Sequence, residues 1–219
     1  MTEIPYTIRR SDRARRVRVT VDAVDGVEVV LPRRAREREA ERAMRELRPW
    51  VERRMRAHDK ARAEAGAPPG HVPYHGEHLR LVPERGRERV HRRDHTLLVP
   101  ARDANAALER WYRRAAKTEI APRVEQAVAE AGVDYERLRI GGQRTRWGSC
   151  SSTGTLSFNW RLLLAPEDVL DYVVWHEVCH LEVPDHSKRF WRLVERHFPG
   201  YREQERWLRR YGSALVLDT

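Results

Sequence analysis

The stretch from His176 to His186, HEVCHLEVPDH, constrains the fold most strongly, because it places three histidines and a glutamate within eleven residues. In a helix each residue advances about 100°, so His176 and His180 lie on one face, one turn apart. Glu177 projects to one side of their midline. Pro184 then ends the helix, and a reversal of the chain would bring His186 back toward the first two histidines. The stretch therefore predicts a helix, a sharp break and a cluster of three imidazoles.

This spacing is typical of a metal site. In the HExxH pattern two histidines bind a zinc ion and the glutamate serves as general base. Catalytic zinc usually has three protein ligands and one open position, so a third histidine is expected. Ten of the 219 residues are histidine, so chance would rarely produce this arrangement. We therefore expect one zinc ion per chain, bound by His176, His180 and His186, with Glu177 as catalytic residue. Cys179, on the opposite side from Glu177, is expected to be a buried core residue.

Composition indicates a soluble protein of one large or two small domains, with 35% charged and 40% hydrophobic residues. No apolar run approaches the length of a membrane span. The Arg-rich N-terminus is not followed by a continuous apolar segment, so no secretory leader is expected. Only Cys150 and Cys179 could form a disulfide, which is no disulfide framework. We expect a cytoplasmic protein.

The formal net charge of +10 lies mainly in the N-terminal part. Residues 1–100 contain 24 Lys and Arg against 16 Asp and Glu, whereas residues 101–219 contain 19 against 17. Such a basic part is a candidate surface for nucleic acid or a nucleotide. However, its arginines alternate with glutamates over residues 33–48, which favours a solvated helix face with i,i+4 ion pairs.

The N-terminal part is expected to be rich in strands. Alternating valines on both sides of Asp25-Gly26 predict a β-hairpin over residues 16–32. Apolar residues at three-to-four spacing predict a helical region over residues 35–65, in which Pro49 starts a second helix or kinks the first. After the Pro/Gly break at residues 65–70, residues 72–99 are expected to form a short three-stranded meander.

The C-terminal part is expected to alternate helices with a few strands. A long helix should begin at Asp103 and continue past Pro122 to Gly132. Strands are expected over residues 136–140 and 143–150 and over Thr155–Asn159, followed by the histidine helix from near Pro166 and by two short helices. The predicted fold class is α+β. Its basic, mostly antiparallel β region with a helical insertion spans residues 1–100, and its α+β core with the HExxH helix spans residues 101–219. The two regions could form one continuous domain.

Residues 143–191 carry four motifs in a fixed order: R-W-G-S-C, N-x-R-L, D-Y-V-x-x-H-E-x-x-H-L and H-S-x-x-F-W. This block resembles the YgjP-like metallopeptidase domain, a family of zincin-like enzymes related to SprT-like and WLM proteases. The resemblance implies a zincin-like core, zinc bound by the three histidines and Glu177 as the base. The histidine spacing also equals that of metzincins, but Val183 stands where those have glycine. No methionine follows Met55, so a Met-turn is excluded.

The expected reaction is peptide-bond hydrolysis on a peptide or protein substrate. A zinc-bound water would lose a proton to Glu177 and attack the carbonyl. Tyr201, Tyr211 and His197 are candidates for a second group that stabilises the oxyanion, and sequence does not choose among them. An extended substrate would need a free sheet edge, for which the strand Thr155–Asn159 is the candidate.

Three further residues are candidates for substrate binding. Arg144 and Arg146 could bind a carboxylate or phosphate, or could pair with acids of the next helix. Asn159 ends the candidate substrate strand.

Two other functions use the same metal. A metal-activated water could hydrolyse the phosphoanhydride of a nucleoside triphosphate, although no phosphate-binding Gly-rich loop and no carboxylate cluster suited to magnesium is present. Alternatively, the chain could be a basic DNA-associated protein with a structural metal, which predicts salt-sensitive duplex binding that survives Glu177→Gln.

Overall fold

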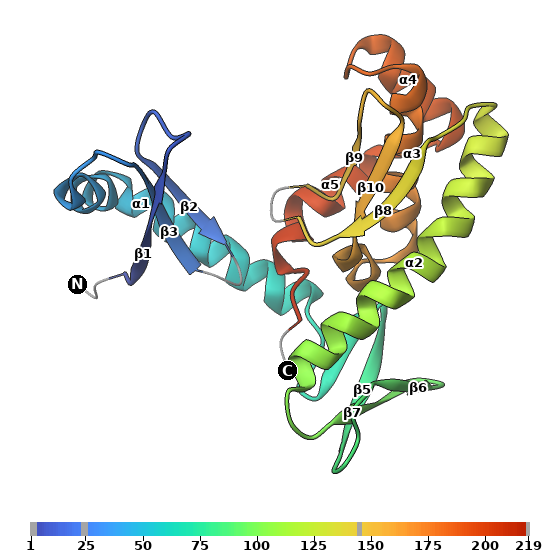
Figure 1. Ribbon diagram of the computed structural model, residues 1–219, viewed down its shortest axis with the longest axis horizontal. Helices are drawn as coiled ribbons and strands as arrows, with labels where there is room; N and C mark the ends of the chain where they lie inside the picture. Colours follow the sequence, from blue (N-terminus) through green and yellow to red (C-terminus); the bar gives the residue numbers. More distant parts are fainter. Residues whose placement is uncertain (1–3, 23–25, 144–145, 218–219) are drawn as a thin grey trace. The chain divides into compact units, whose positions relative to one another are not determined.

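The computed structural model describes residues 4–22, 26–143 and 146–217 (Figure 1). It contains helices and three small sheets, which confirms the α+β class. Two compact units divide between Ala65 and Gly66, at the Pro/Gly break. The boundary expected at residue 100 thus falls inside the second unit, because the strands before it share a hydrophobic core with the long helix that follows. No helix of the described residues is long and apolar enough to cross a membrane.

The first unit is a three-stranded sheet covered by one helix. Its strands β1 (Tyr6–Ser11), β2 (Arg18–Asp22) and β3 (Gly26–Pro32) lie in the order β1-β3-β2. The antiparallel pair β2–β3 confirms the hairpin, although Asp25 of its turn lies outside the described residues. The parallel pairing of β1 with β3 had no sequence signal.

The helix α1 (Glu37–Ala65) is continuous across Pro49, which excludes a second helix starting there, the first of the two alternatives. Met44 and Val51, one on each side of Pro49, are both buried in the hydrophobic cluster of this unit. A proline inside a helix removes one hydrogen bond. Here the helix stays continuous, with buried apolar contacts on both sides of the proline.

The second unit begins with a four-stranded sheet. Its strands β4 (His71–Tyr74), β5 (Glu77–Glu84), β6 (His91–Arg93) and β7 (Thr96–Pro100) lie in the order β4-β5-β7-β6. The central strands β5 and β7 are parallel, so the expected three-stranded meander is wrong. Alternation identified apolar strands but carried no information on their pairing partners.

Helix α2 (Ala104–Ala131) continues past Pro122 and ends at Gly132, whose φ of 68° is left-handed, as expected for a glycine cap. Asp103 stands at its N-cap, but its side chain makes no capping hydrogen bond. A second sheet follows, formed by β8 (Arg137–Gly141), β9 (Gly148–Cys150) and β10 (Thr155–Asn159) in the order β8-β10-β9. Because β10 is central, it offers no free edge for a substrate, contrary to expectation. The outer strands of this sheet are β8 and β9, and of the two β9 packs against α3.

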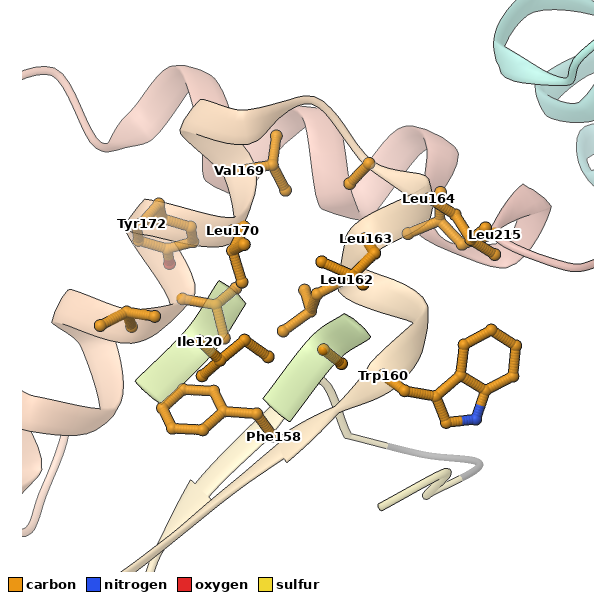
Figure 2. Close-up of a cluster of buried hydrophobic side chains, with 14 of the residues drawn as sticks. Ile120, Phe158, Trp160, Leu162, Leu163, Leu164, Val169, Leu170, Tyr172 and Leu215 are labelled. Carbon is orange, nitrogen blue, oxygen red and sulfur yellow. The ribbon is translucent and has the colours of Figure 1, made fainter. Parts of the chain in front are cut away.

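The chain then passes through the short 3-10 helix η1 (Trp160–Leu164) into α3 (Glu167–Glu182), α4 (Lys188–His197), α5 (Arg202–Tyr211) and η2 (Gly212–Ala214). Side chains from α2, β10, η1 and α3 form a continuous hydrophobic core. Figure 2 shows Ile120, Phe158, Leu162, Leu163 and Leu170 gathered at its centre. The sheet and α3 are therefore fixed against each other beside the histidines.

Removal of one buried hydroxyl should destabilise this core measurably. Tyr112 of α2 is fully buried, and its hydroxyl donates a hydrogen bond to the carbonyl of Pro73 in β4. Tyr112→Phe leaves that carbonyl without its donor and should cost about 1–2 kcal/mol. Tyr135→Phe is the matched control, because its hydroxyl bonds the exposed Glu125. Urea unfolding at constant m should show a lower midpoint for Tyr112→Phe only; equal midpoints for the two variants would contradict this account.

Candidate metal centre

Helix α3 presents the first two histidines and the glutamate from a firmly buried segment. It begins directly after Pro166, and its first turn carries Glu167 and Asp168, whose charges suit a helix N-terminus. Apolar residues along one side anchor it in the core: Val169, Leu170, Val173, Val174 and Val178. The helix ends at Glu182, and Pro184 prevents its continuation, as the sequence predicted.

The third histidine returns to the first two. The Nε2 atom of His186 lies 3.1 Å from Nε2 of His176 and 3.2 Å from Nε2 of His180. A tight turn fixes this reversal, in which the N–H of Ser187 donates to Oδ1 of Asp185 over 2.9 Å. The three residues form a group that could hold a metal ion, with ligand atoms within 4.8 Å of one another. The expected cluster of imidazoles is therefore present.

The protonation of these rings suits a cation. Nδ1 of His180 lies 3.0 Å from the carbonyl oxygen of Val183, which can only accept, so Nδ1 carries the proton and Nε2 exposes a lone pair. Burial lowers the pKa of His176 to about 3, helped by its two histidine neighbours, and burial also lowers the pKa of His180. Neutral imidazole is the form that binds metals. The donor set therefore fits a metal ion.

Aromatic residues of α4 enclose the imidazoles. Phe190 stacks on His180 with ring centroids 4.3 Å apart and contacts His176 edge-on at 5.0 Å. The ring centroid of Trp191 lies 5.8 Å from that of His176 and 5.7 Å from that of His186. These rings restrict the orientation of the imidazoles and exclude water from one side of the site. They also explain the F-W pair that follows His186 in the sequence.

Glu177 is buried beside the histidines and against strand β9. Its exposed fraction is 5%, and the backbone N–H of Cys150 donates a hydrogen bond to its carboxylate. Burial raises its pKa to about 8, although the charge of Arg146 and the Cys150 N–H act in the opposite direction. A carboxyl group with a pKa near neutrality can both accept and return a proton.

The three candidates for the oxyanion stabiliser lie in different surroundings. Tyr201 is buried, stacks on Trp191 at 5.1 Å and forms a hydrogen bond with Arg202. His197 stacks on Trp175 at 4.6 Å and lines a cavity of about 460 Å³ beside α2. The ring of Tyr211 contacts Trp207 and Arg210. Of the three, Tyr201 shares a neighbour, Trp191, with the histidines.

The candidates for substrate binding also separate. Arg144 lies outside the described residues, and Arg146 is exposed, with its charge acting on Glu177. Asn159 is 2% exposed: Nδ2 donates to the carbonyls of Gln143 and Arg146, and Oδ1 accepts from the N–H of Arg161. Its amide thus holds the segment before β9.

Two features near Glu177 were missed by the sequence analysis, the N–H of Cys150 and the absence of a side chain at Gly148. The R-W-G-S-C motif was the only signal for them, and it gave no mechanism. Cys179 is buried, as expected.

The model of the YgjP-like metallopeptidase domain matches residues 15–211. The chain belongs to this family. The YgjP-like assignment confirms the resemblance, and it makes the protein a metallopeptidase, a hydrolase of peptide or protein substrates. No curated protein matches the chain significantly.

Two solved structures are similar to the chain. The metallopeptidase zymogen abylysin of Pyrococcus abyssi is 27% identical, with 42% of this chain and 95% of that chain covered and a TM-score of 0.39. The zymogen jannalysin of Methanocaldococcus jannaschii is 20% identical, with 44% and 97% covered and a TM-score of 0.38.

The buried carboxyl group should make the metal-free YgjP-like protein less stable at high pH. The pKa of Glu177 rises from 4.5 to about 8 on folding, so its contribution is fully present below pH 4.5 and is lost as the pH rises through 8. Glu177→Gln removes this loss. Urea unfolding of EDTA-treated proteins should show the variant gaining about 2–4 kcal/mol over the wild type between pH 5 and pH 8. A difference that is independent of pH would contradict the burial of the charge.

Proposed function

We propose that the chain is a zinc-dependent peptidase whose metal is bound by His176, His180 and His186. The observation that supports it is the convergence of three imidazoles, in which Nε2 of His186 lies 3.1 Å from Nε2 of His176 and 3.2 Å from Nε2 of His180. Imidazole suits zinc, whereas magnesium and calcium prefer oxygen ligands. Three protein ligands leave one position open, as in catalytic zinc sites.

When bound, zinc supplies a Lewis acid that polarises the peptide carbonyl and lowers the pKa of water at its open position. Glu177 accepts a proton from the attacking water and then delivers it to the leaving amine nitrogen. Phe190 and Trp191 cover one side of the imidazoles, and Tyr201 is the candidate donor to the oxyanion.

The substrate backbone would bind along β9. Ser151 donates its N–H to Thr155, and Trp147 accepts from Asn159, so residues 147 and 151 direct their backbone groups toward β10. The backbone N–H and C=O groups of successive residues point to opposite sides of a strand, so those of Gly148 and Cys150 point toward the free edge of β9. A peptide added to this edge would lie beside Glu177. We therefore propose β9, in place of β10, as the strand along which a substrate would bind.

Glu177→Gln should abolish turnover without releasing zinc. The amide keeps the size of the side chain but cannot accept the proton of water, so kcat should fall by about 10²–10⁴-fold. His186→Ala should lose zinc as well, because it removes one of three ligands. His91→Ala, on the exposed strand β6, is the matched control and should retain both zinc and activity. Elemental analysis and cleavage of a peptide library measure the two properties.

Parallel incubations with nucleoside triphosphates and with duplex DNA test the alternatives. Hydrolysis of the triphosphates without any peptide cleavage would contradict the peptidase proposal. Salt-sensitive DNA binding that persists in Glu177→Gln, with no hydrolysis by the wild type, would favour a structural metal.

A further inference from the structure

The R-W-G-S-C motif, residues 146–150, has no assigned role in the peptidase mechanism, yet it lies against the proposed base. Strand β9 comprises its last three residues, and each of the two that face the free edge contacts Glu177. Between them, Ser149 lies opposite Ser157 of β10, and its backbone groups point toward β10. The motif therefore has one side in the sheet and one side toward the carboxylate.

Gly148 leaves the space that the Glu177 side chain occupies. A Cβ atom built at Gly148 would lie 2.5 Å from Oε1, 2.6 Å from Cγ and 2.8 Å from Cδ of Glu177. Real Cβ atoms do not approach other atoms this closely, so either the strand or the carboxylate would have to move. The φ of Gly148 is not positive, so its backbone does not itself require glycine. The requirement comes from the contact with Glu177.

The strand that forms this contact is held on several sides. The carboxamide of Asn159 donates a hydrogen bond to the carbonyl of Arg146, the first residue of the motif. The indole of Trp147 packs against Gly212, where a Cβ would come within 3.1 Å of it. On the other side, β9 pairs with the central strand β10. Because β9 cannot easily retreat, a methyl group at residue 148 would displace the carboxylate.

We propose that Gly148 is a positioning residue for hydrolysis: strand β9 fixes the Glu177 carboxylate through the close approach at Gly148 and the N–H of Cys150. The inference rests on the proposed role of Glu177 as base. It assigns the R-W-G-S-C motif to alignment of that base next to the edge where the substrate would bind.

In Gly148→Ala, the Glu177 carboxylate must shift by about 1 Å to restore an ordinary van der Waals distance to the new methyl group. A displacement of this size can cost about 10²-fold in rate. Because the three atoms nearest to a Cβ at Gly148 all belong to Glu177 and none to a histidine, the metal should remain bound. The expected signature is a loss in kcat, with KM changed by less than about threefold.

A double-mutant cycle tests the proposal on the full-length zinc enzyme. The four proteins are the wild type, Gly148→Ala, Glu177→Ala and the combination, and kcat, KM, zinc content and Tm are measured for each. Alanine at residue 177 removes Cγ, Cδ and Oε1, the three atoms that a methyl group at residue 148 would meet. Gly148→Ala should therefore cost about 10²-fold in kcat beside glutamate but less than about threefold in the residual kcat of the Glu177→Ala background. Gly141→Ala, in β8 of the same sheet, is the matched control, since the three atoms nearest to its Cβ all belong to the flexible amide of Gln143.

Several results would overturn the inference. They are an equal loss of kcat in both backgrounds, full activity of Gly148→Ala, and release of zinc by that change. If Gly148→Ala lowers Tm strongly, Glu177→Ala should restore it, and a Tm that stays low would also overturn the inference. Activity that survives Glu177→Gln would instead refute the proposed function, so the two failures are distinguishable.

Discussion

The site depends on the convergence of three imidazoles, with Nε2 of His186 held 3.1 Å from Nε2 of His176 and 3.2 Å from Nε2 of His180. Neutral rings that direct lone pairs toward one point repel one another unless a proton or a cation lies between them. Burial opposes the proton, since it keeps the pKa of His176 at about 3. The buried face of α3, the turn at Pro184 and the wall formed by Phe190 and Trp191 all maintain this convergence. The fold thus keeps together groups that a bound cation would stabilise.

Burial of the Glu177 carboxylate, in the same helix, also costs free energy. Its carboxylate lies 5% exposed in an apolar surrounding, and the neighbours that favour its charged form are the Cys150 N–H and the charge of Arg146. Both come from the segment around β9, the strand whose free edge is our candidate for substrate binding. The proposed base and the proposed substrate edge are therefore parts of one arrangement, and a change in either would alter the other.

Local patterns in the sequence predicted the local structure well. The spacing of His176 and His180, the break at Pro184 and the glycine cap at Gly132 all act within a few residues, and the structure has each of them. Pairing between distant strands carries no such signal, so the parallel pairs β1–β3 and β5–β7 and the central place of β10 were missed. The helix across Pro49 shows tertiary packing prevailing over a local rule. Gly148 belongs to a recognisable motif, but its contact with Glu177 could not be predicted because it forms only where β9 packs against α3.

X-ray absorption at the zinc edge of the metal-loaded protein tests the central claim most directly, because it reports the ligands themselves. Three histidines and an open position predict a first shell of nitrogen and oxygen only, at about 2.0–2.1 Å, with the outer scattering pattern of imidazole rings. A sulfur scatterer at about 2.3 Å would place Cys150 or Cys179 on the metal. That result, or a shell without imidazole, would contradict the account.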